Sequence, residues 1–301
     1  MEGVGFVGGI GLVGPGGVRC RTRGRVSMSR IDRCPSAGVL QTLIRQREYR
    51  FRGSSTHIQA DGVADGTDSS FILQDEGFAG VADTGAHDLS STYGDVLATR
   101  IRYENRTLLD NVVRKVLFSP PESRWTSISK YIENALSLLT FPKFASTCIL
   151  SLEDQKLRAA WVGSSGFIVI RGDMIVYSSL PSAVDSLESS LSNQRSAPNP
   201  LVAESAVIDV EEEDLIVLAT DGLWDNVTDC QVLSYLRPQQ IEGFVTREWD
   251  DPKRQSSTLA YLGTAYADLE ERDCFVSNRF VSGATHDDVT AVVLQIAKRG
   301  Q

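Results

Sequence analysis

Four aspartates stand where an apolar segment of the sequence ends or begins. An apolar run ends at Asp221 and a shorter one ends at Asp83, while Asp287 opens the last apolar segment and Asp68 precedes a short one. A carboxylate at a strand end is held by a rigid sheet and can point into a cleft. Several carboxylates brought together repel one another unless a cation neutralises them, and oxygen ligands favour Mg²⁺ or Mn²⁺ over zinc. The pattern therefore predicts a magnesium or manganese site.

The alternative interpretation of each stretch is an ordinary turn. Asp-Gly, as at Asp221 and Gly222, is a common turn dipeptide because Asp bonds its own backbone and Gly accepts positive φ. Recurrence of the same pattern at four strand ends favours a shared site over four unrelated turns.

The basic residues are concentrated at the start of the chain. Through Arg52 there are ten arginines, no lysine and three acidic residues, whereas the rest has 20 basic and 36 acidic residues, a net charge of −16. An arginine-rich, acid-poor leader is typical of an organelle transit peptide. We therefore expect a leader over residues 1–55, a folded domain over residues 56–301, and a location in a mitochondrion or plastid. A disordered basic tail on an otherwise cytoplasmic protein, or less readily a secretory signal, is the alternative.

Composition excludes two further classes of protein. An acidic domain repels phosphate backbones, so no nucleic-acid partner is expected. The apolar start of the leader is too short and too interrupted by Gly and Pro15 to span a bilayer, so no integral membrane segment is expected. The five cysteines form no CxxC pair and are expected to be free thiols.

The spacing of apolar residues predicts strands and helices in separate groups. Residues 53–66 are small and polar and are interpreted as a linker or first turn. The predicted strands cover residues 69–73, 77–82, 147–152, 157–162, 167–171, 174–178, 206–210, 215–219 and 289–296, and the predicted helices cover most of 88–117, 125–139, 229–236 and 257–269. The four strands between 147 and 178 are interpreted as an antiparallel meander, and the acidic run 211–214 as a solvated turn. Grouped antiparallel strands with paired helices indicate an α+β fold.

Six motifs together give the chain a family resemblance. They are Gly-Thr-Asp-Ser-Ser-Phe from Gly66, Gly-Val-Ala-Asp from Gly80, Ala-Ser-Thr-Cys-Ile-Leu from Ala145, Trp-Val-Gly-Ser-Ser-Gly-Phe-Ile-Val-Ile-Arg-Gly from Trp161, Ala-Thr-Asp-Gly-Leu-Trp-Asp-Asn from Ala219 and His-Asp-Asp-Val-Thr from His286. In this order they resemble the metal-dependent protein serine/threonine phosphatases of type 2C, and especially their short organellar branch. The resemblance implies a four-layer α/β/β/α sandwich, in which two antiparallel sheets are flanked by helices.

The resemblance also implies a site and a reaction. Asp83 would bridge two Mg²⁺ or Mn²⁺ ions, with Asp221 and Asp287 on the first ion and Asp68 and the Thr84 carbonyl on the second. Asp83, Asp221 and Asp287 would be the catalytic set. A metal-activated water would then hydrolyse phosphoserine or phosphothreonine on a protein substrate.

The chain departs from the family pattern at several positions. The usual acid beside Asp68 is Thr67, a glycine after Asp83 is Thr84, and the acid of a Gly-Asp-Ser-Gly motif is Ser164. A phosphate-binding arginine expected before the first acid is missing, because His57 is the one basic residue between Gly53 and Asp68.

Two histidines near the acids have both a catalytic and an ordinary interpretation. His87 could protonate a leaving alkoxide, and His286 could orient Asp287, but both are also typical loop residues. Trp161 and Trp224 are expected to be core aromatics.

The sequence leaves three hypotheses about function. The first is the phosphoprotein phosphatase. The second is a phosphatase-like regulatory binding module with weak or no catalysis, which Thr67 and Ser164 favour and the retained Asp83, Asp221 and Asp287 oppose. The third is a metal hydrolase that acts on a small phosphate ester.

Overall fold

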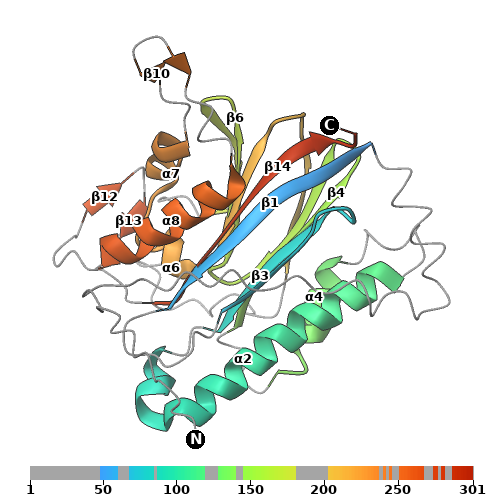
Figure 1. Ribbon diagram of the computed structural model, residues 1–301. Coiled ribbons are helices and arrows are strands. Elements are labelled where there is room, and N and C mark those ends of the chain that lie inside the picture. The colour runs from blue at the N-terminus through green and yellow to red at the C-terminus, as the bar shows by residue number, and fades with distance from the viewer. Residues whose placement is uncertain are drawn as a thin grey trace, which may run out of the picture.

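The computed structural model describes residues 48–59, 68–84, 87–118, 128–139, 145–180, 203–236, 240–241, 244–245, 251–267, 274–276, 279–281 and 287–300. Two five-stranded antiparallel sheets lie face to face in this part of the chain (Figure 1). The first sheet has the order β1 (Tyr49–Ile58), β14 (Val289–Lys298), β9 (Leu215–Ala219), β6 (Gly166–Arg171) and β7 (Met174–Ser178). The second has the order β2 (Ser69–Leu73), β3 (Phe78–Thr84), β4 (Ala145–Glu153), β5 (Lys156–Val162) and β8 (Glu204–Asp209).

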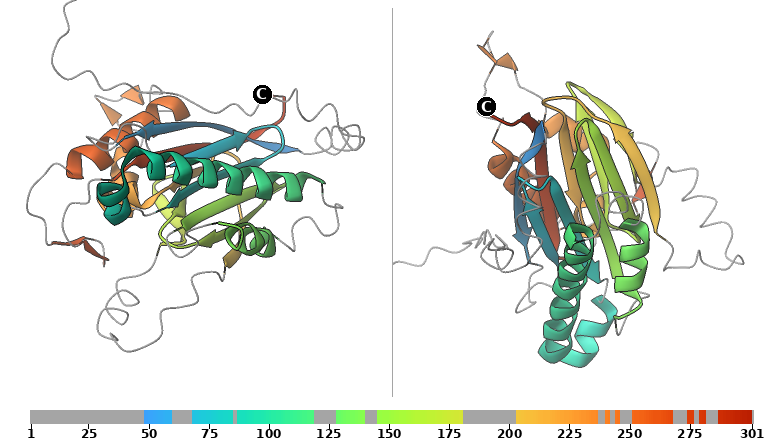
Figure 2. Two further views of the ribbon diagram at one scale, coloured as in Figure 1. Left: turned by 90° about the horizontal axis from the view of Figure 1, so that it is seen from below. Right: turned by 90° about the vertical axis from the view of Figure 1, so that its right-hand side faces the viewer.

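Helices cover the outer face of each sheet, as the two views of Figure 2 show. On the second sheet lie α2 (His87–Phe118) and α4 (Ile128–Leu136). On the first lie α6 (Asp221–Trp224), α7 (Asp229–Leu236) and α8 (Pro252–Ala267). Two small hairpins join β10 (Gln240–Ile241) to β11 (Phe244–Val245) and β12 (Cys274–Val276) to β13 (Arg279–Val281). The α+β class and the four-layer sandwich are therefore confirmed.

Alternation of side chains along the strands builds three apolar layers. In β9, Ile216 and Leu218 point into the core between the sheets, whereas Val217 and Ala219 pack beneath the helices of the first sheet. Both faces of β9 are thus buried, as its unbroken apolar run predicts. The remaining layer lies between the second sheet and the α2–α4 pair. Trp224 and Trp161 are both buried, which confirms them as core aromatics.

The first strand is the main element that the sequence analysis missed. Tyr49–Ile58 pairs along its whole length with β14, so the interpretation of residues 53–58 as linker is wrong. The folded domain already includes Tyr49, ahead of the expected boundary at residue 56. Only Tyr49, Phe51 and Ile58 are apolar in this strand.

The four strands between residues 145 and 178 do not form one meander. Strand β5 pairs with β4 and β8, whereas β6 pairs with β7 and β9, so the chain passes from the second sheet to the first between β5 and β6. The strands themselves lie where they were predicted. The expectation of a single meander is wrong because the partners β8 and β9 come later in the sequence.

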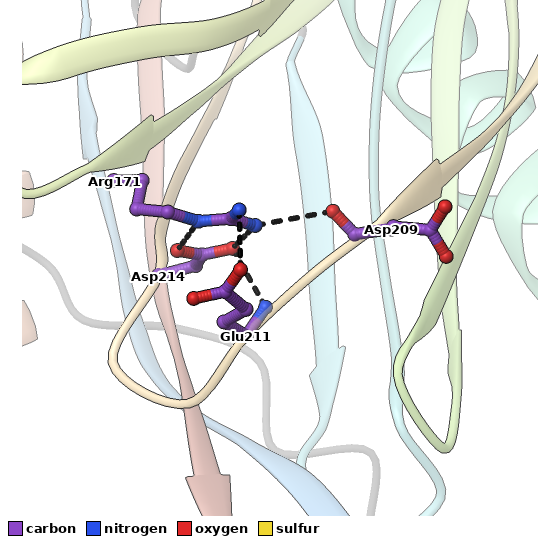
Figure 3. A network of polar contacts seen from close by, with 4 residues as sticks. All are labelled: Arg171, Asp209, Glu211 and Asp214. Atoms are coloured by element: carbon purple, nitrogen blue, oxygen red, sulfur yellow. Dashed lines mark hydrogen bonds and ion pairs between the residues drawn. The ribbon is translucent and has the colours of Figure 1, made fainter.

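A polar cluster lies where strand β6 ends, and its members are Arg171, Asp209, Glu211 and Asp214 (Figure 3). Arg171 at the end of β6 donates from Nε and Nη2 to the two carboxylate oxygens of Asp214, at 2.9 and 2.8 Å. It also donates to Glu211 at 2.6 Å and to the carbonyl of Asp209 at 3.2 Å. Glu211 and Glu213 are exposed, as a solvated turn predicts, but Asp214 is 1% exposed, so the prediction is wrong for that residue. The cluster ties the β8–β9 connection, which runs from one sheet to the other, to β6.

Removal of the guanidinium should destabilise the protein strongly. In Arg171→Ala the buried Asp214 loses its paired charge and two hydrogen bonds, and leaving a buried acceptor unsatisfied costs about 1 to 3 kcal/mol. Thermal or urea unfolding measures this loss. The matched control is Lys156→Ala, because Lys156 and its partner Asp209 are both exposed and such pairs contribute about 0 to 1 kcal/mol. Equal losses in the two variants would contradict a stabilising role for the Arg171 cluster.

Within the part of the chain that the structure describes, no helix combines the length and apolar character needed to cross a bilayer.

Candidate metal centre

Strand β3 delivers Asp83 to the space between the two sheets. Ala79 and Val81 point into the core between the sheets, and Asp83 continues the same face of the strand. Its residue is 1% exposed, and both carboxylate oxygens are buried without a hydrogen-bond partner. A carboxylate in this environment needs a positive partner or a proton.

The end of β9 and the short helix α6 deliver Asp221. Thr220 is extended, with φ −82° and ψ 171°, and the chain turns into α6 at Asp221. The indole nitrogen of Trp224 donates to the carbonyls of Gly166 and Ala219, at 3.1 and 3.0 Å, which fixes this turn against the first sheet. Asp221 is therefore held by packing and by hydrogen bonds on both sides.

Asp287, just before β14, completes a group of three carboxylates. One ligand atom from each of Asp83, Asp221 and Asp287 lies within 4.8 Å of the others. Asp287 Oδ1 also accepts the backbone N–H of Asp288 at 2.6 Å. The three residues lie at the ends of three different strands, one from the second sheet and two from the first. Their approach is therefore a tertiary feature and not a local turn.

Asp68 stands beside this group but outside it. It directly precedes β2, whose first residue Ser69 pairs with Ala82, the neighbour of Asp83. Asp68 is 8% exposed, and its Oδ2 accepts a hydrogen bond from the Thr220 hydroxyl at 2.8 Å. Its Oδ1 is buried and has no hydrogen-bond partner.

Burial and like charge act together on these acids. The pKa of Asp83 is raised well above its usual value, first by burial and then by the charges of Asp68 and Asp221. The pKa of Asp68 is raised in the same way, first by burial and then by Asp288. Without a cation, these carboxyl groups therefore bind protons more readily than ordinary acids.

The residues fit a hard divalent cation. Four buried carboxylate oxygens lack hydrogen bonds, one each on Asp68 and Asp221 and two on Asp83, and oxygen donors of this type suit Mg²⁺ or Mn²⁺. Burial removes the water that would otherwise stabilise the negative charge of these carboxylates. A cation among them would stabilise that charge instead.

Ser164 takes part in the site in a way that the sequence did not predict. Its hydroxyl donates to Asp221 Oδ2 at 2.7 Å, which leaves Oδ1 as the buried oxygen without a partner. The residue that departs from the family acid is thus a hydrogen-bond donor to a candidate ligand.

His57 on β1 does not replace the missing arginine as a cation. Its Nδ1 lies 2.8 Å from the Thr290 hydroxyl. Burial lowers the pKa of His57, an effect that the charge of Asp288 opposes and that of Arg102 reinforces. The imidazole is therefore neutral near pH 7.

Several predicted positions have no described side chain. Thr84 ends β3 opposite Ala145, and His87 begins α2, but their side chains lie outside the described part, as do Thr67 and His286 entirely. Their predicted roles remain predictions.

The chain is similar to known phosphatases along most of its length. It is 26% identical over 253 residues to "Protein phosphatase PTC7 homolog" of Danio rerio, and the matched region covers 79% of this chain and 83% of that protein. It is 27% identical over 242 residues to "Probable protein phosphatase 2C 55" of Arabidopsis thaliana. The matched region covers 77% of this chain but only 48%, about half, of that protein. No family model matches the sequence.

A solved structure supports the same relationship at the level of fold. The catalytic domain of the serine threonine protein phosphatase PstP, in complex with 2 manganese ions, superposes with a TM-score of 0.56 and 14% identity, over 83% of this chain and 99% of that one. The sequence is thus similar to type 2C protein phosphatases over most of its length, and the chain has the fold of a solved phosphatase domain.

Proposed function

We propose that this chain hydrolyses phosphoserine and phosphothreonine on proteins with Mg²⁺ or Mn²⁺ as cofactor. The observation that carries the proposal is the approach of Asp83, Asp221 and Asp287 to within 4.8 Å, with buried oxygens that no hydrogen bond satisfies. The relatives named as protein phosphatases support the same activity.

The acids divide between two candidate cation positions. Asp83, Asp221 and Asp287 would hold the first ion, and Asp83, Asp68 and the Thr84 carbonyl would serve the second, directly or through water. When bound, such ions lower the pKa of a coordinated water and stabilise negative charge on the phosphoryl group. The identity and the number of the ions belong to the proposal.

The protein side chains then have positioning and electrostatic tasks. The three clustered carboxylates arrive on separate strands of both sheets, so the sandwich fixes their spacing before any ligand binds. Ser164 fixes one oxygen of Asp221 by its hydrogen bond. Phosphate would be transferred to water, so no side chain has to act as a nucleophile.

The binding-module hypothesis is not favoured by the site. Ser164 departs from the family acid, yet it supports Asp221 by a hydrogen bond and does not disrupt it. The unpaired oxygens of Asp83 also remain in place, although they are costly to bury without a cation.

Release of phosphate from a phosphothreonine peptide by the full chain tests the proposal. We expect turnover with Mn²⁺ or Mg²⁺ and none after a chelator removes the metal. A parallel assay on p-nitrophenyl phosphate separates the protein phosphatase from a hydrolase of small esters, because the latter would favour the small substrate. A folded chain that binds Mn²⁺ but releases no phosphate would move the binding-module hypothesis to the front.

The location of the protein is also a proposal. The ten arginines and three acids through Arg52 support import into a mitochondrion or plastid. A fusion of residues 1–48, which precede β1, to a fluorescent protein should locate to the organelle, and a diffuse distribution of the fusion would refute the transit peptide.

A further inference from the structure

The hydroxyl of Thr220 occupies a place in the strand pairing that a backbone carbonyl would otherwise fill. The backbone N–H of Thr220 donates to the carbonyl of Thr290 at 3.2 Å, which extends the pairing of β9 with β14 by one residue. Its own carbonyl is used by α6, where it accepts the N–H of Leu223 at 3.2 Å and that of Trp224 at 3.4 Å. The N–H of Thr290 donates to Thr220 Oγ1 instead, at 3.1 Å.

The direction of the hydrogen bonds through this hydroxyl is fixed by its neighbours. A backbone N–H can only donate, so Oγ1 accepts from Thr290. Thr220 Oγ1 donates its single proton to Asp68 Oδ2, at 2.8 Å, which is the direction that a carboxylate ionised by a bound cation requires, because it can only accept. Thr220 is fully buried, and hydrogen bonds in such a chain strengthen one another.

This hydrogen bond connects the two sheets at the site. Thr220 follows β9 in the first sheet, and Asp68 precedes β2 in the second. The bond occupies Oδ2 of Asp68 and leaves Oδ1 as its buried oxygen without a partner. The residue that leads directly into Asp221 therefore also sets the carboxylate orientation of an acid from the opposite sheet.

We propose that Thr220 is a positioning residue for the cation site. Its hydrogen bond orients Asp68 so that Oδ1 is the oxygen available to a divalent cation or to water bound to that cation. The proposal rests on the proposed function in so far as the cation is its cofactor. It assigns Thr220 no contact with substrate, because its effect passes through Asp68.

Mn²⁺ binding to the full chain, measured by isothermal titration calorimetry, is the primary test. Thr220→Val keeps the shape but removes the hydroxyl, and we expect about 10- to 100-fold weaker Mn²⁺ binding, as for other groups that orient a ligand. Thr220→Ser keeps the hydroxyl and is expected to bind Mn²⁺ within about twofold of wild type, since the group that donates to Asp68 is retained. Thr220→Ala serves in the same way if the valine variant does not fold, as judged by thermal unfolding without metal.

A double-mutant cycle separates positioning from a general disturbance of the sheet. In an Asp68→Ala background, Thr220→Val should change Mn²⁺ affinity by no more than about twofold, because the group through which it acts is gone. An equal loss in both backgrounds would overturn the proposal. Wild-type affinity in Thr220→Val, or failure of Thr220→Ser to restore binding, would overturn it as well.

The same measurements distinguish this proposal from the proposed function. If wild type binds Mn²⁺ with an affinity that depends on Thr220 and Asp68 but releases no phosphate, the phosphatase activity alone is refuted. If the wild-type chain shows metal-dependent turnover, and Thr220→Val changes neither this turnover nor the Mn²⁺ affinity, the positioning role alone is refuted. Absence of Mn²⁺ binding by wild type refutes both.

Discussion

Replacement of Asp83 by Asn is expected to lower phosphate release at least about a thousandfold, because metal ions supply several kcal/mol of transition-state stabilisation. The same is expected of Asp221→Asn, since both acids contribute to the three-carboxylate group. The substitution keeps the size of the side chain and removes one of several clustered negative charges. The metal-free variants should therefore unfold at the same temperature as wild type or at a higher one.

Thermal unfolding with and without Mn²⁺ separates loss of metal from loss of fold. A ligand at about 100 times its Kd stabilises the folded state by about 2.7 kcal/mol, so Mn²⁺ should raise the unfolding temperature of wild type but not of Asp83→Asn. Asp209→Asn is the matched control, because this acid is exposed on β8 and should keep full turnover. Full turnover in Asp83→Asn or Asp221→Asn would refute the assignment of the site.

The raised pKa values give the metal-free protein a defined response to pH. Burial, followed by neighbouring charge, raises the pKa of Asp83 and Asp68 in the folded state above the value of an unfolded chain. Between those two values the folded state binds more protons, so the contribution of Asp83 and Asp68 to stability is greatest at low pH and falls as pH rises through the window. Asp83→Asn should flatten this dependence, consistent with its expected gain in metal-free stability.

Gly222→Ala is expected to damage both the fold and the site. A Cβ on this residue would lie 2.2 Å from the carbonyl oxygen of Asp288 and 2.9 Å from its carbonyl carbon. These are backbone atoms, so either α6 or the start of β14 must shift, and overpacking of this kind costs about 1 to 3 kcal/mol. The shift would separate Asp221 from Asp287, and a displacement of about 1 Å at reacting groups can reduce turnover about a hundredfold.

A second glycine provides the control for this substitution. Gly172, in the turn between β6 and β7, has φ +60°, and a Cβ there would meet nothing within 4 Å. Gly172→Ala should cost about 1 kcal/mol of stability through backbone strain and leave turnover unchanged. If Gly222→Ala keeps wild-type turnover and Mn²⁺ affinity, the close approach of α6 to β14 is not what holds Asp221 and Asp287 together.

The candidate ligands could be found from the sequence because each is attached to a local pattern. Asp83 lies near the end of one apolar strand and Asp221 lies two residues after another, so the strand prediction also locates the acid. The structure describes strands at all the predicted positions, and β9 is buried on both faces as its composition indicates.

What the sequence could not provide is the identity of distant partners. Alternation of apolar residues predicts a strand but not the sheet to which it belongs, so the crossing between β5 and β6 was missed. Strand β1 was missed because it contains Arg, Ser, Gly and His where core strands have apolar residues. Asp214 was expected in solvent because its partner, Arg171, lies 43 positions earlier.

The same limit applies inside the site. Thr220 and Asp68 are 152 positions apart, so their hydrogen bond has no local sequence signal. The sequence shows Thr220 only as the residue before Asp221. Its second task becomes visible when the two sheets are placed face to face.

The pairing of β1 with β14 has a consequence for the order in which the protein folds. Phe51 pairs with Ile296, so the first strand of the domain must wait for its last strand before it acquires its neighbour. Closing such a long loop is entropically costly, and contacts between distant segments form slowly. Asp287 lies two residues before β14, and the closing strand therefore brings the last of the three clustered carboxylates. A chain that has not yet completed this sheet lacks the full set of ligands, and cation binding favours the finished fold over every earlier intermediate.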